Sequence, residues 1–117
     1  MTITENKQGR VTVVSLKGNL LGEPEATALR ETIYRLTERD EKQVVLDLGD
    51  VKALNSTGLG ILVSALTSLR SRSGDLSLAR LSEKAHALMM ITHLFKVFRV
   101  YDTVERAVAG YERRLER

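Results

Sequence analysis

The residues with the clearest capacity for chemistry form a short polar turn, Asn55-Ser56-Thr57, which is followed by Gly58 and Gly60. Hydroxyl groups at the start of a predicted helix can serve two purposes. They can accept hydrogen bonds from free backbone N–H groups and so cap the helix. Alternatively, one of them can carry a phosphate, because the positive end of a helix favours anions. The residues alone leave both interpretations open, since the two glycines could also serve only to let the helix approach a sheet.

The other potentially reactive groups give weaker indications of a function. No G-x-S-x-G pattern surrounds Ser56, so it does not resemble a hydrolase nucleophile. The run Gly58-Leu59-Gly60 lacks the lysine and the spacing of a phosphate-binding loop. His86 and His93 stand about 10 Å apart along a helix, and the chain has no cysteine, so we expect packing or surface roles for them. We therefore expect neither a metal nor a cofactor, and a kinase substrate rather than an enzyme.

The elements that position this turn follow from turn residues and hydrophobic periodicity. Thr2–Glu5 and Val11–Leu16, separated by Gln8-Gly9, predict an N-terminal hairpin that ends in an exit loop over residues 17–22. The apolar run Val44–Leu48 predicts a central strand that is covered on both faces. The remaining predictions are helices over 24–39 and from about 56 to a stop at Gly74, a strand over 76–81, a helix capped by Ser82, an edge strand over 97–101, and a last helix capped by Asp102.

Strands that alternate with helices predict right-handed crossovers and an at least partly parallel sheet. We therefore expect an α/β fold with a mixed sheet of four to five strands and about four helices. At 117 residues the chain is long enough for one domain, which we place over residues 1–117.

The composition of the chain bears on its possible partners and its location. The 18 basic residues are interleaved with 15 acidic ones, which predicts a mixed surface and no nucleic-acid partner. No apolar stretch is long enough for a membrane span, and the first residues do not form a signal pattern, so we expect a cytoplasmic protein. The chain has no heptad pattern, and we expect a monomer.

The segment Leu46–Gly60 resembles the signature of bacterial anti-sigma-factor antagonists, the anti-anti-sigma branch of STAS domains. In that family a V-L-D-L strand leads into D-S-[ST]-G-[LI]-G. Two weaker likenesses extend over the chain: Val14–Leu20 is similar to the L-x-G-x-L strand exit of the family, and Leu94–Phe98 to its late L-F-x-x-F segment. The resemblance implies a STAS-like fold for the whole chain.

The resemblance also implies a function. In the family, the serine after the aspartate is phosphorylated by a partner serine kinase of the GHKL type, which doubles as the anti-sigma factor. This role maps onto Ser56, with Thr57 as second choice. The unmodified antagonist binds the kinase and displaces the sigma factor, the phosphorylated form lets go, and a phosphatase can reset the site. The partner-binding residues that we expect are Asn19, Leu21, Gly22, Asn55, Ser56, Thr57, Gly58 and Leu59.

Three positions depart from the family pattern. Asn55 replaces the aspartate before the serine, Leu21 stands where the family has an acidic residue, and His93 stands where it often has glycine. Asn55 favours an alternative in which the chain is a non-switching STAS scaffold or a transporter-associated subunit. The intact run from Ser56 to Gly60 favours the switch.

Overall fold

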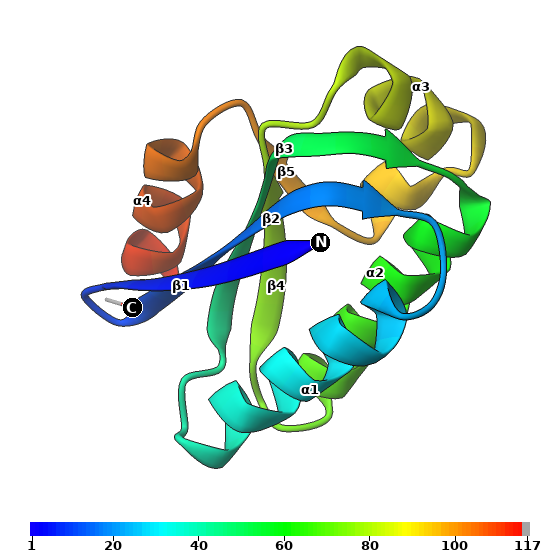
Figure 1. Cartoon of the computed structure of the whole chain (residues 1–117). Helices are drawn as coiled ribbons and strands as arrows, with labels where there is room; N and C mark the ends of the chain where they lie inside the picture. The colour runs from blue at the N-terminus through cyan, green and yellow to red at the C-terminus, as the bar shows by residue number, and fades with distance from the viewer. Residues whose placement is uncertain (116–117) are drawn as a thin grey trace.

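The computed structural model describes residues 1–115 as one five-stranded sheet with helices on both faces (Figure 1). The elements are β1 (Thr2–Gln8), β2 (Val11–Leu20), α1 (Glu25–Glu38), β3 (Gln43–Leu54), α2 (Ser56–Arg70), β4 (Asp75–Ala79), α3 (Glu83–Ile91), a 3₁₀ turn η1 (Leu94–Lys96), β5 (Arg99–Tyr101) and α4 (Val104–Leu115). The strands lie in the order β1-β2-β3-β4-β5. β1 is antiparallel to β2 and all other pairs are parallel, which confirms the predicted hairpin and mixed sheet.

Two strands are longer than the sequence predicted. β2 continues through the expected exit loop to Leu20, and β3 continues beyond its apolar run to Leu54. The two extensions pair with each other, because Leu20 lies opposite Leu54 in a parallel register that contains two irregularities. Mutual backbone pairing therefore compensates for the polar residues that ended the hydrophobic pattern. The expectation that residues 17–22 form a loop was wrong for residues 17–20.

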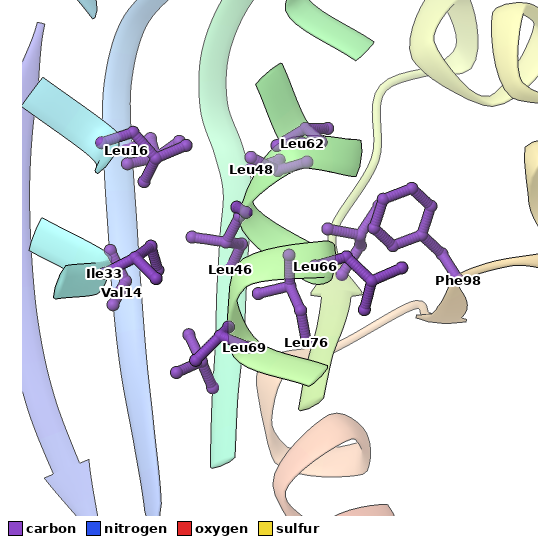
Figure 2. Close-up of a cluster of buried hydrophobic side chains, with 14 of the residues drawn as sticks. Val14, Leu16, Ile33, Leu46, Leu48, Leu62, Leu66, Leu69, Leu76 and Phe98 are labelled. Carbon is purple, nitrogen blue, oxygen red and sulfur yellow. The ribbon is translucent and has the colours of Figure 1, made fainter. Parts of the chain in front are cut away.

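Alternation along the strands creates two cores. The larger core lies between the sheet and the helices α1, α2 and α3, and Figure 2 shows its aliphatic side chains from β2, α1, β3 and α2 meeting in the interior. The smaller core lies under α4 on the opposite face and is centred on Tyr111. The Tyr111 hydroxyl donates a hydrogen bond of 2.9 Å to the Val44 carbonyl, and burial raises the pKa of this phenol above its ordinary value. β3 is central and covered on both faces near its start, as predicted.

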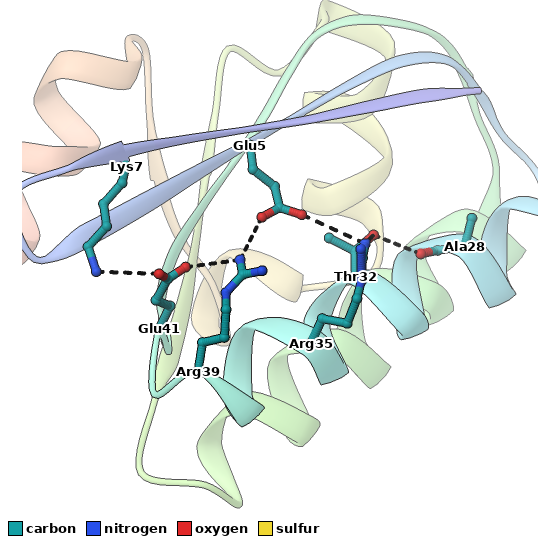
Figure 3. A network of polar contacts seen from close by, with 7 residues as sticks. All are labelled: Glu5, Lys7, Ala28, Thr32, Arg35, Arg39 and Glu41. Atoms are coloured by element: carbon teal, nitrogen blue, oxygen red, sulfur yellow. Dashed lines mark hydrogen bonds and ion pairs between the residues drawn. The ribbon is translucent and has the colours of Figure 1, made fainter.

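The edge strand β1 is fastened to the end of α1 by charges (Figure 3). Glu5 accepts a 2.8 Å hydrogen bond from Arg39 and lies 3.7 Å from Arg35. Glu41 in turn contacts both Arg39, at 3.1 Å, and Lys7, at 3.6 Å. Exposed pairs of this kind contribute up to about 1 kcal/mol each to stability. The main effect of the network is therefore to position the edge strand β1 against the end of α1.

Two predicted helix boundaries need correction. α4 is capped by Thr103, whose hydroxyl accepts a hydrogen bond from the Arg106 amide, and not by Asp102. α2 ends at Arg70, before the predicted stop at Gly74. The left-handed residue after this helix is Ser73, with φ of 65°, while a side chain at Gly74 would overlap the Lys42 carbonyl. Ser82 caps α3 as predicted, since it accepts a hydrogen bond from the Ala85 amide. Within residues 1–115, no helix is long and apolar enough to cross a membrane.

Candidate functional site

The candidate site lies at the edge of the sheet where the neighbouring strands β2 and β3 end. Asn19 pairs with Ala53, and Leu20 with Leu54, so the segments that follow the two strands emerge side by side. One segment leads into α1 and the other into α2 (Figure 1). Residues that are more than thirty positions apart in the sequence therefore contribute to one surface.

Asn55 fixes the start of α2. Its backbone is extended, with φ of −124° and ψ of −174°, and its side-chain oxygen accepts a 2.8 Å hydrogen bond from the Gly58 amide. The Asn55 carbonyl accepts a second bond, of 2.9 Å, from the Leu59 amide. Asn55 is thus the helix cap, a role that the sequence had left to the hydroxyls of Ser56 or Thr57. Asparagine and aspartate cap helices about equally well, so the departure from the family pattern preserves the geometry and removes only a charge.

Ser56 and Thr57 occupy the first two positions of α2, and both are exposed. Neither hydroxyl forms a hydrogen bond with any other residue of the described range 1–115, because Asn55 already caps the helix. The first turn of α2 also contains no acidic residue. No carboxylate within this first turn therefore opposes a negative charge, and an anion attached at this position would be stabilised by the positive end of the helix.

Gly58 and Leu59 lie beneath this surface. A Cβ atom at Gly58 would overlap the carbonyl oxygen of Leu20, so glycine is what allows α2 to press against the end of β2. Leu59 is only 2% exposed and belongs to the larger core. We expected both residues on the partner-binding face, but the geometry buries them. Leu59 belongs to the same apolar stripe that predicted α2, and this periodicity was the signal for its burial.

The β2 side of the site contributes an exposed apolar residue. Leu21 is 42% exposed, Asn19 is exposed, and Gly22 is partly exposed with open space around its Cα. They lie at or just after the end of β2, which pairs with the end of β3 that precedes the exposed residues of the α2 turn, and we group the two sets as one surface. We call it the switch surface, and it consists of Asn19, Leu21, Gly22, Asn55, Ser56 and Thr57.

Charge beside the switch surface is modest. Glu23 accepts hydrogen bonds from the hydroxyl and the amide of Thr27, at 2.8 to 2.9 Å, and these bonds lower the pKa of the Glu23 carboxyl. On the other side, a hollow of about 200 Å³ lies between the end of β3 and the start of α3, and Lys52 and Lys84 line it.

The histidines lie away from the switch surface. The ring of His86 packs against that of Phe95, with a centroid distance of 4.6 Å. His93 adopts a left-handed backbone with φ of 60°, which accounts for the glycine that the family often has at this position. Among residues 1–115, no group of three or more His, Asp or Glu side chains could hold a metal ion.

The fold and this surface define a small α/β domain that displays a serine at the end of its central strand. The sequence profile of the STAS domain matches residues 2–107, and the chain belongs to the STAS domain family.

Individual proteins resemble the chain in sequence and fold. A Thermotoga maritima protein named as an anti-sigma factor antagonist is 31% identical over 72 residues, which cover 62% of this chain and 64% of the relative, slightly less than two thirds of its length. The anti-sigma F factor antagonist of Paenibacillus polymyxa is 22% identical over 102 residues, or 87% of each chain. The structure of the Bacillus cell fate determinant SpoIIAA in its phosphorylated form superposes with a TM-score of 0.72 at 16% identity, and covers 94% of this chain and 99% of that one.

Proposed function

We propose that this chain is an anti-sigma-factor antagonist. In its unmodified form it binds an anti-sigma factor of the GHKL serine-kinase type through the switch surface and so frees the sigma factor. Phosphorylation of Ser56 by the same partner ends the complex, and a phosphatase restores it. The protein works in the cytoplasm as a binding protein, with no catalytic step of its own.

The observation that carries this proposal is the free, exposed hydroxyl of Ser56 at the first position of α2. The cap is supplied by Asn55, so modification of Ser56 breaks no hydrogen bond that the fold needs. The relatives named as anti-sigma factor antagonists support the class of partner. SpoIIAA, which has the same fold, supports the modification because its structure is of a phosphorylated form.

The charge of a phosphate is large enough for the switch. Phosphorylation adds about −1.5 to −2 charges at pH 7. Unfavourable charge placement in a protein interface costs several kcal/mol, and about 1.4 kcal/mol changes affinity tenfold. Leu21, which is exposed in the free chain, would be buried in the same interface. A loss of a hundredfold or more in affinity is therefore expected from this single modification.

One observation favours a second candidate, a STAS scaffold that does not switch. Asn55 lacks the carboxylate with which the family precedes its serine, and a kinase that reads this carboxylate would not act here. Asn55→Asp separates the two candidates, because the variant keeps the cap and restores the charge. A chain that is phosphorylated only as this variant would be a scaffold.

The test uses the purified full chain and each GHKL-type serine kinase encoded in the same genome. Binding is measured by calorimetry, and phosphorylation by intact mass after incubation with ATP. We expect one kinase to bind the wild type and to add one phosphate, and we expect Ser56→Ala to bind without being modified. Ser56→Asp, which adds a single negative charge, should bind more weakly than the wild type by roughly tenfold or more, and less weakly than the phosphorylated chain.

Thr57→Ala is the matched control, because it removes a neighbouring exposed hydroxyl from the same helical turn. It should keep phosphorylation at Ser56, while its affinity for the kinase measures what the Thr57 side chain contributes to the switch surface. Phosphate on Thr57 instead of Ser56 would move the switch by one residue. Equal affinity of the kinase for wild type, Ser56→Ala and Ser56→Asp would refute the switching model.

A further inference from the structure

A long open groove runs between α1 and α2 on the outside of the molecule. Its volume is about 740 Å³, and its lining extends along α2 from Thr57 to Ser68 and continues to Arg72 in the turn after the helix. The helical parts of this lining run from residue 26 to 37 on α1 and from 57 to 68 on α2, so each has eleven steps of 1.5 Å and spans about 16 Å. Buried side chains of the larger core, including Leu29 and Ile33, form its floor, and Tyr34, which is 57% exposed, stands on its α1 side.

The charged residues that line the groove, within the described part of the chain, are all positive. Its only charged lining residues within the described part of the chain are Arg30 and Arg72, and no acidic residue lines it. Neither guanidinium forms an ion pair with another residue of the range 1–115, whereas Arg35 on α1 and Arg39 directly after it are paired with Glu5. Both guanidinium groups are exposed and can meet an acidic ligand, although the charge of Arg30 also acts on Glu23, whose pKa is lowered mainly by its hydrogen bonds to Thr27 and to a lesser extent by Arg30.

The α2 wall of the groove is low because its exposed residues are small. Gly60, Ser64 and Ser68 follow at intervals of four and therefore lie on one face of the helix. A Cβ atom at Gly60 would meet nothing within 4 Å, so no contact inside the chain requires glycine there. Glycine inside a helix costs about 0.5–1 kcal/mol relative to alanine. Small residues at such spacing allow a second helix to approach closely.

We propose that the α1–α2 groove is the docking surface for an amphipathic helix of a partner protein, which places apolar side chains on the groove floor and acidic side chains against Arg30 and Arg72. The helical walls of the groove fit about three turns, or about 11 residues, of a bound helix. A trough of this length, open to solvent, suits a polypeptide better than a compact small molecule. Helix-in-groove recognition of this kind depends on apolar anchors spaced three and four residues apart.

The groove is coupled to the switch surface. Thr57 belongs to both, and α1 and α2 begin at the same edge of the sheet. A phosphate on Ser56 would therefore stand at one end of the groove and carry the same sign of charge as the acidic helix. This coupling rests on the proposed function, but the groove itself does not.

The experiment is a nuclear magnetic resonance titration of the ¹⁵N-labelled full chain with a synthetic peptide. The probe is a 15-residue amphipathic helix with leucine and alanine on one face and glutamate at both ends. A second peptide has lysine in place of every glutamate. We expect the acidic peptide to shift the amides of Gly60, Ser64 and Ser68, and the basic peptide to bind at least about tenfold more weakly.

Variants sharpen the test. Arg30→Glu combined with Arg72→Glu should reverse the preference, so that the basic peptide binds better, and Gly60→Leu should weaken the acidic peptide by filling the groove. Arg99→Glu is the matched control, because Arg99 is exposed but lies outside the groove, and it should change nothing. Preserved amide spectra of each variant establish that it is folded.

The inference would be overturned if the acidic peptide shifted no amide signals at concentrations up to about 1 mM, or if it shifted only amides outside the groove. It would also be overturned if the wild type and the double variant each bound the acidic and the basic peptide with equal affinity. Shifts of the groove amides by ATP but not by the peptide would assign the groove to a small anion and would equally overturn it. Ser56→Asp should weaken the acidic peptide. If Ser56→Asp binds the acidic peptide as well as the wild type does, the docking groove is supported but its coupling to Ser56 is refuted. If no kinase binds the chain while the peptide still binds, only the proposed function is contradicted.

Discussion

Replacement of Gly58 by alanine tests the contact that joins the two halves of the switch surface. The added Cβ atom would overlap the Leu20 carbonyl oxygen, which cannot easily retreat because Leu20 pairs with Leu54 in the sheet. Overpacking of this kind costs about 1–3 kcal/mol, while alanine recovers about 0.5–1 kcal/mol of helix propensity. We expect a net loss of about 1–2 kcal/mol. For a chain of this size, that lowers the melting temperature by roughly 4–8 °C.

Gly60→Ala is the matched control, since both glycines lie in the first two turns of α2 but only Gly60 faces open space. This variant should stabilise the chain by up to about 1 kcal/mol. Urea unfolding of the two variants and the wild type, monitored by circular dichroism, measures the difference between them. If Gly58→Ala were as stable as Gly60→Ala, α2 would not press against the end of β2, and the proposed geometry of the switch surface would be wrong.

Three further changes have defined outcomes. Asn55→Ala should cost about 1 kcal/mol in urea unfolding because it removes the cap of α2, and Asn55→Asp should cost little. Tyr111→Phe should cost about 1 kcal/mol through loss of the bond to the Val44 carbonyl. Because burial raises the pKa of Tyr111, this residue's contribution is present below pH 10 and lost as the pH rises toward its raised pKa, so the wild type should lose its advantage over the phenylalanine variant in alkaline solution. Glu23→Gln should reduce stability at pH 7. The lowered pKa of Glu23, which comes from its bonds to Thr27, makes this difference shrink as the pH falls below 4.5, measured by thermal melts across pH 2–7.

Most of the fold was predictable because its elements carry strong periodic signals. The stripe along α2 and the apolar run at the start of β3 identified their elements and their buried faces. The ends of β2 and β3 were not predictable in the same way. Residues 49–54 contain glycine, aspartate and lysine, which a strand tolerates here only because the end of β2 lies alongside and supplies hydrogen-bond partners. Pairing between distant segments leaves no local trace in a sequence.

The candidate site was predicted in part. The sequence placed a hydroxyl at a helix start and left the cap to Ser56 or Thr57, and only the backbone shows that Asn55, which caps helices equally well, is the residue used. The opposite error occurred at Leu59, where the motif suggested a surface role although the helical period already indicated burial. At Leu59 the family motif and the hydrophobic periodicity of the helix led to different predictions. The residue is buried, as the periodicity predicted, because the hydrophobic core constrains every turn of the helix.

The division between exposed and buried residues determines how this site can evolve and be regulated. Ser56 and Thr57 are exposed and do not belong to the larger core, so modification there should alter charge at the surface while the packing beneath stays intact. Gly58 and Leu59, directly after them in the sequence, hold the turn against β2 and the core. Substitution at Ser56 should therefore change partner affinity at constant stability, whereas substitution at Gly58 should change both together. A Ser56→Asp variant that melted several degrees below the wild type would show that the hydroxyl supports the fold, and would contradict this separation of switch and scaffold.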